Sequence, residues 1–184
     1  MAVSRMTDPD SEEKQWVPLS TGTAVALSLL AAWMARQHFL SADAWVFLLD
    51  SVNLALHEAG HPMVALFSSR LSVYGGTLFQ LLFPALFAHH FWRQRQAAGW
   101  AASLLWLAEN LMNVGRYMKD ARARELPLVG GGDHDWTEIF SRWGVLAHDV
   151  RIGNSCKALG LALAVYALWW AWRHRRQDGG RLLT

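Results

Sequence analysis

The residues best suited to chemistry lie in one short stretch, His57-Glu58-Ala59-Gly60-His61. On an α-helix, residues four positions apart lie on the same face, so the imidazoles of His57 and His61 can bind one metal ion. In this HExxH pattern the ion is typically Zn²⁺, which lowers the pKa of a bound water, and the glutamate takes a proton from that water. The stretch therefore predicts a zinc site suited to hydrolysis, with Glu58 as general base.

Two polar residues extend the same helix face toward the amino terminus. Asp50 and Asn53 precede His57 at spacings of three and four, which places them in the turns before it. Carboxylate and amide groups in such positions can orient a metal-binding imidazole. Polar groups of this kind also hold membrane helices together through interhelical hydrogen bonds. Both roles remain open for Asp50 and Asn53.

A catalytic zinc site needs a third protein ligand. Three glycines precede polar residues in the stretch Gly130-Gly131-Gly132-Asp133-His134-Asp135-Trp136, and their freedom would let those side chains reach a metal. We favour His134 as this ligand. Asp135 is the alternative, although with Glu138 three residues later it also fits the capping box of a short helix. Asp120, earlier in the same polar link, is a further carboxylate candidate.

One apolar run also carries two amides, Asn110 and Asn113, on one helix face. In a peptidase, such amides can bind the substrate backbone or the oxyanion that forms during hydrolysis. Interhelical hydrogen bonding is the alternative for both residues.

The composition indicates which kind of scaffold positions these residues. Of the 184 residues, 53% are hydrophobic, 17% are charged and eleven are tryptophan. Soluble domains carry about 25% charged residues, so the area that water can solvate is small. Disorder, collagen and disulfide-rich secreted folds are excluded, and the single Cys156 forms no internal disulfide. The near-neutral net charge of +2 does not suit a nucleic-acid-binding protein.

Five apolar runs approach the length of about 20 residues that a spanning helix needs. Tryptophan and arginine near their ends fit the interfacial positions of these side chains. We therefore predict an all-α, polytopic membrane helix bundle with about five transmembrane helices and one long polar link before the last. The predicted spans are residues 17–35, 44–67, 75–92, 97–118 and 158–172, with the link at 119–157, a polar tail at 1–16 and a basic tail at 173–184.

This prediction makes the chain a multi-pass integral membrane protein, located in the inner membrane if the source is bacterial. Membrane lipids are the expected partners, together with a transmembrane protein substrate or partner subunits. With five spans, the amino-terminal tail, the turn at 68–74 and the link at 119–157 lie on one side of the membrane. The helix that carries His57 and His61 then points toward the link.

The stretch NLALHEAGHPMVALF resembles the active-site helix of the site-two-protease class of intramembrane zinc metallopeptidases. Over about residues 53–153, the succession HEAGHP, GGTLFQLLFP, DARARELPL and GGGDHDW is similar to a group of uncharacterised, peptidase-like bacterial membrane proteins. The resemblance implies that His57 and His61 bind zinc and that Glu58 is the base. The class takes its third ligand from an LDG motif, which does not occur here, so His134, Asp135 and Asp120 remain candidates.

The sequence thus predicts a membrane-embedded zinc metallopeptidase that hydrolyses a peptide bond in a membrane or membrane-proximal substrate. The alternative is a non-catalytic accessory or structural subunit of a membrane protein complex, with or without a structural metal. The two hypotheses differ at the fourth coordination position. An enzyme leaves that position open to a cavity, whereas a structural site fills it with a protein atom.

Overall fold

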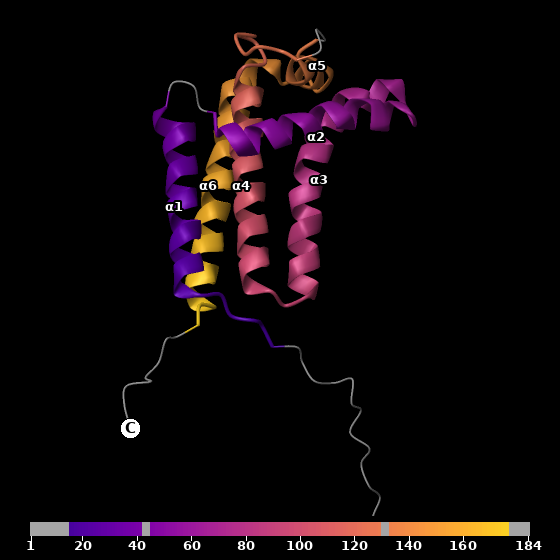
Figure 1. Ribbon diagram of the computed structural model, residues 1–184. Coiled ribbons are helices and arrows are strands. Elements are labelled where there is room, and N and C mark those ends of the chain that lie inside the picture. Colours follow the sequence, from indigo (N-terminus) through magenta and orange to yellow (C-terminus); the bar gives the residue numbers. More distant parts are fainter. Residues whose placement is uncertain (1–14, 42–44, 130–132, 177–184) are drawn as a thin grey trace, which may run out of the picture.

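The computed structural model describes residues 15–41, 45–129 and 133–176, and their regular structure is helical. The all-α expectation is thereby confirmed, since these ranges contain isolated bridges but no strand. Figure 1 labels the α-helices. In chain order the elements are α1 (Thr21–Leu40), α2 (Phe47–Ala65), the 3-10 turn η2 (Ser69–Leu71), α3 (Ser72–Arg93), α4 (Ala97–Lys119), α5 (Asp135–Arg142), the 3-10 turn η3 (Leu146–His148) and α6 (Asp149–Arg173).

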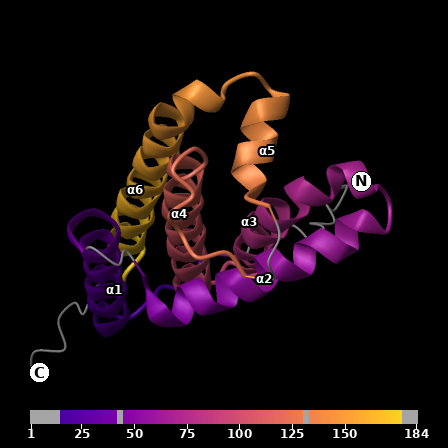
Figure 2. The ribbon, with the colours of Figure 1, turned by 90° about the horizontal axis from the view of Figure 1, so that it is seen from above.

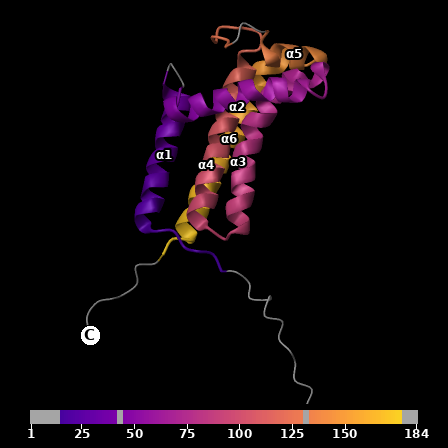
Figure 3. The same ribbon diagram turned by 45° about the vertical axis from the view of Figure 1, so that its right-hand side comes forward.

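Helices α1, α3, α4 and α6 run alongside one another, whereas α2 lies across one end of them (Figures 1 and 3). Helix α5 lies at the same end, which we call the α2 end, and the view from above shows both elements there (Figure 2). Helix α4 is central, because it packs against α1, α3 and α6 and also contacts α2 and α5. Residues carried by α2, α4 and α5 can therefore meet at the α2 end.

Two segments of the described chain are long and apolar enough to cross a membrane, Ser69–Arg93 and Leu146–Arg173. The expectation of about five spans is not confirmed. The run at 44–67 forms α2, which lies across the bundle instead of along it (Figure 1). The run at 97–118 forms α4, in which Glu109, Asn110 and Asn113 lower the hydropathy.

The crossing direction of α2 also corrects the predicted arrangement of the chain ends. The backbone N–H of Val17 donates to the carbonyl of Arg95 (2.8 Å), and that of Arg176 donates to the carbonyl of Leu19 (2.7 Å). The described ends of the chain therefore meet opposite the α2 end, and not beside the 119–157 link. The turn at 68–74 does lie near this link, since Arg142 Nη1 donates to the carbonyl of Arg70 (2.6 Å).

Two glycines allow α2 and α3 to cross in direct backbone contact. A Cβ atom on Gly60 would overlap the backbone of Gly75, and one on Gly75 would overlap the backbone of Gly60. Small residues at a helix crossing permit this close approach. The crossing places the HExxH face of α2 over the first turns of α3.

Helix α5 is fixed by an apolar cluster beneath it. Trp136, Ile139 and Phe140 are buried and pack with Val73 of α3 and Val114 of α4. Burial of side chains of this size contributes roughly 1.5–3 kcal/mol each relative to exposure. The cluster therefore holds the first residue of α5 at a defined place at the α2 end.

Candidate metal centre

Three side chains from two distant segments converge at the α2 end. Nε2 of His57 lies 2.9 Å from Oδ2 of Asp135, and Nε2 of His61 lies 3.3 Å from the same oxygen. Ligand atoms about 2.0–2.1 Å from a tetrahedral ion lie about 3.3–3.4 Å apart, which is close to the observed spacing. Among the described residues, these three form the group of histidine, cysteine and acidic side chains whose ligand atoms lie within 4.8 Å of one another.

The other nitrogen of each imidazole already has an acceptor. Nδ1 of His61 lies 2.9 Å from the carbonyl of Ser72, and Nδ1 of His57 lies 3.3 Å from Oε1 of Gln80. When Nδ1–H donates to these oxygens, the lone pair of the neutral ring is on Nε2. This is the arrangement that metal-binding histidines adopt. The two rings are thus oriented with Nε2 toward Asp135, and loss of the Nε2 proton would leave a lone pair there for a metal.

A glycine makes room for the first of these rings. A Cβ atom on Gly76 would lie 2.5 Å from Cε1 and Nε2 of His57. No side chain larger than hydrogen fits there without moving the imidazole. The two adjacent glycines of α3 thus leave space for different neighbours: Gly75 for the backbone of α2 and Gly76 for the His57 ring.

Asp135 is suited to be an anionic ligand. Burial favours the neutral acid, but the hydrogen bonds from His57 and His61 outweigh burial and hold the pKa of the Asp135 carboxyl below its usual value. Its backbone N–H donates to the hydroxyl of Tyr117 at 3.2 Å. Asp135 is therefore ionised and tied to α4 by its own backbone.

His134, the favoured third ligand from the sequence, does not join this group. It is the N-cap of α5, and its Nδ1 accepts the backbone N–H of Thr137 at 3.3 Å. Its Nε2 lies 3.3 Å from Oδ2 of Asp120, away from the two other histidines. Burial lowers the pKa of His134 although Asp120 opposes the change, so the ring is neutral and can cap the helix. The structure thus places Asp135, and not His134, beside His57 and His61, and gives the N-cap position to His134.

Asp120 organises the loop after α4 and does not reach the metal group. Its two carboxylate oxygens accept the backbone N–H groups of Glu125 (2.9 Å) and Leu126 (3.1 Å). The loop then continues as Leu126, Pro127, Leu128 and Val129, which form part of a cavity wall. Gly130, Gly131 and Gly132 of the predicted flexible run lie outside the described residues.

Asp50 and Asn113 continue the hydrogen-bond chain that begins at His57. Nε2 of Gln80 donates to Oδ1 of Asn113 at 2.9 Å, and Nδ2 of Asn113 donates to Oδ1 of Asp50 at 2.5 Å. The backbone N–H of Val46 donates to the other oxygen of Asp50. These residues act on the site through Gln80, and they also connect α2, α3 and α4.

Asn53 and Asn110 are buried and connect α2 to α4. Oδ1 of Asn53 accepts hydrogen bonds from Nδ2 of Asn110 (3.1 Å) and from Nε1 of Trp106 (2.8 Å). Nδ2 of Asn53 donates to Glu109, whose other oxygen lies 3.2 Å from Nε2 of His38 in α1. For these two asparagines the structure supports the interhelical role.

The metal group opens onto a cavity of about 510 Å³. Glu58, half-buried on α2, lines this cavity beside His57 and His61. The opposite wall includes the loop at 126–129, Asp133 and the start of α5. The acid that follows the first histidine is thus directed into the same space as the ligands.

Two partners of the imidazoles have no signal in the HExxH pattern. The carbonyl of Ser72 cannot be inferred from residue type, because any residue would supply it. Gln80 has a weak signal, since it is the single polar side chain in the run LFQLLFPALF. His38 is buried and faces Glu109, although the predicted first span ended before it.

Replacing Gln80 by leucine is expected to weaken zinc binding about 10–100-fold, the usual effect of removing a hydrogen bond that orients a ligand. The affinity is measured by competition with a coloured zinc chelator in detergent solution. Gln94→Leu is the matched control, because Gln94 is exposed beyond the end of α3. Equal affinities for the two variants would show that Gln80 does not orient His57.

Comparison of the chain with known protein families, with curated proteins and with solved structures finds no match. The interpretation of the site therefore depends on its own geometry. That geometry joins two histidines of one helix to an aspartate 78 positions after the first of them, beside a cavity that contains a glutamate.

Proposed function

We propose that the chain is a membrane-embedded zinc metallopeptidase whose site lies at the α2 end of the bundle. The observation that carries the proposal is the convergence of two Nε2 atoms, from His57 and His61, on one oxygen of Asp135. Two imidazoles and one carboxylate are a ligand set typical of catalytic zinc. Glu58 and an adjoining cavity of substrate size accompany this ligand set.

His57, His61 and Asp135 would hold the Zn²⁺ ion, which would supply Lewis-acid chemistry toward water and the substrate carbonyl. Glu58 accepts one proton as the water oxygen bonds to the carbonyl carbon. It then returns this proton to the amide nitrogen as the C–N bond breaks, which leaves a carboxylic acid and an amine; the acid then passes its proton to the amine or to water. The position of Glu58, directly after a ligand and exposed to the cavity, supports this role.

The number of ligands supports an enzyme over an accessory subunit. A structural zinc site usually closes with four protein ligands, whereas a catalytic site has three. The metal group of the described residues contains three, because His134 is directed to Asp120. A fourth position on the cavity side is the place where a substrate would bind.

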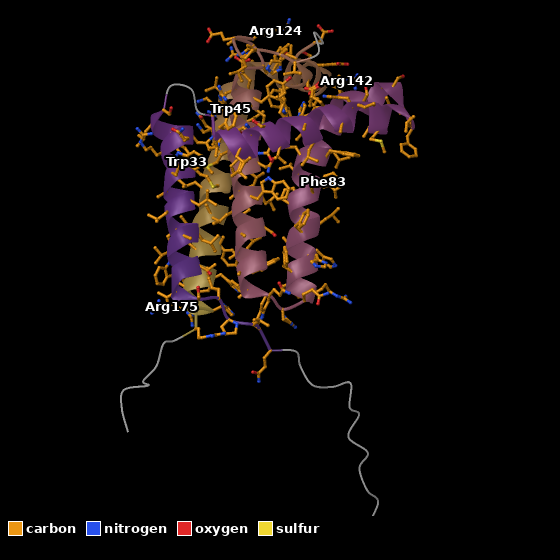
Figure 4. The ribbon with its side chains drawn as sticks, viewed as in Figure 1. Trp33, Trp45, Phe83, Arg124, Arg142 and Arg175 are labelled. Carbon is orange, nitrogen blue, oxygen red and sulfur yellow. The ribbon has the colours of Figure 1, made fainter. Side chains whose placement is uncertain are left out.

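In the proposed membrane arrangement, α1, α3, α4 and α6 cross the bilayer and α2 lies near its surface. Arg124 and Arg142 lie at the α2 end and Arg175 at the opposite end (Figure 4), as expected for basic side chains at the two interfaces. Large exposed apolar side chains on α1 and α6, such as Leu29 and Val165, suit contact with lipid. Susceptible peptide bonds would then lie close to the membrane surface.

The test uses the purified full chain in detergent with a mixed library of synthetic peptides, and mass spectrometry detects the cleavage products. We expect hydrolysis that 1,10-phenanthroline stops and added Zn²⁺ restores. Zinc bound at about one ion per chain without hydrolysis of any library peptide would instead favour the accessory subunit.

A further inference from the structure

Tyr117, on the last turn of α4, lines the cavity beside the metal group. Its ring centroid lies 5.8 Å from that of His57 and 4.2 Å from that of His134. The side chain is half-buried and lines the same cavity as Glu58. Tyr117 follows Asn113 by four positions on α4, so both residues face the site.

The Tyr117 hydroxyl is held in place but retains its own proton. Its oxygen accepts the backbone N–H of Asp135 at 3.2 Å. A phenol hydroxyl can accept and donate at the same time, and it remains protonated at neutral pH. Among the described residues no acceptor for its proton is found. The O–H group is therefore oriented by a ligand residue and available to a molecule in the cavity.

Hydrolysis of an amide requires such a donor. Attack by water places negative charge on the carbonyl oxygen, and one preorganised donor to that oxygen is worth about 10²–10³ in rate. The two amides predicted from the sequence for this role already make other hydrogen bonds. Asn110 is fully buried and donates to Asn53. Asn113 accepts from Gln80 and donates to Asp50. Arg116 also lines the cavity, but it already takes part in another interaction.

We infer that Tyr117 is a catalytic residue that donates its hydroxyl hydrogen bond to the developing oxyanion of the scissile carbonyl. The inference rests on the proposed peptidase function and adds an electrophilic group to it. No proton leaves the hydroxyl. The hydrogen bond strengthens as the carbonyl oxygen gains charge and weakens again when the C–N bond breaks.

The experiment compares two probes on the Co²⁺-substituted full chain, with binding followed in the visible spectrum of the metal. A blocked dipeptide phosphonamidate has a tetrahedral phosphorus with an oxygen at the oxyanion position. A mercaptoacetyl dipeptide binds the metal through sulfur and has no such oxygen. Tyr117→Phe should weaken binding of the phosphonamidate about 10²-fold or more and leave the affinity for the mercaptoacetyl dipeptide unchanged. Tyr74→Phe is the matched control, because it removes a hydroxyl from a ring that packs on Trp143 outside the cavity.

Each outcome decides the inference. Equal phosphonamidate affinity in wild type and Tyr117→Phe overturns it while the metal site and the proposed function stand. Loss of Co²⁺ from Tyr117→Phe also overturns it, because the hydroxyl would then only position Asp135. If wild type takes up no Co²⁺ and binds neither probe, the proposed function fails and this inference fails with it.

Discussion

Replacing His57 by alanine is expected to reduce bound zinc from about one ion per chain to less than about a tenth, and His61→Ala should do the same. Each substitution leaves one imidazole and one carboxylate, too few to hold the ion against dialysis. Asp135→Ala is expected to have the same effect, since its Oδ2 is the atom on which both rings converge. The measurement is elemental analysis after dialysis against a weak chelator, with protein determined on the same sample.

Two further histidine variants make this experiment decisive. His90→Ala removes an exposed imidazole from the far end of α3 and should keep its zinc. His134→Ala should also keep it, because that side chain caps α5 and faces Asp120. Zinc that remained bound in a variant lacking both His57 and His61 would contradict the metal centre.

Glu58→Gln is expected to retain zinc and to lose about 10²–10⁴-fold in the rate of peptide cleavage, the usual contribution of a general base. The amide has the shape of the carboxylate but cannot accept the proton of the attacking water. The rate is measured with the library peptide that the wild type cleaves fastest, and zinc is determined in parallel.

Glu138→Gln is the matched control for this prediction. Glu138 also lines the cavity, but it pairs with Arg142 on the exposed side of α5. Its variant should cleave at nearly the wild-type rate. A Glu58→Gln protein that kept full activity would rule out Glu58 as the base, and equal losses in both variants would indicate a general effect of cavity charge.

The pairing of His57 with His61 depends only on helical spacing, so the sequence was sufficient to predict it. The identity of the third residue at the site was not accessible in the same way. His134 and Asp135 are adjacent, and the start of α5 between them directs one side chain toward Asp120 and the other toward α2. That choice depends on how α5 docks on Val73 and Val114, which are remote in sequence.

The direction of α2 could not be read from the sequence either. The run at 44–67 has the length of a span, and length and hydropathy specify a helix without specifying its angle to its neighbours. The crossing depends on Gly60 meeting Gly75, a contact between two segments. Asp50 illustrates a related ambiguity, because it both joins α2 to α4 and extends the hydrogen-bond chain from His57.

The separation of 78 positions between His57 and Asp135 gives a bound ion a second effect. An ion shared by these residues would act as a reversible cross-link between α2 and the start of α5. A covalent link that closes a loop of that size lowers the entropy of the unfolded chain, which stabilises the folded state by about 4.5 kcal/mol. If the site binds an ion, tertiary structure at this end and metal content would be thermodynamically coupled, so a chelator would lower the stability of the fold as well as stop hydrolysis.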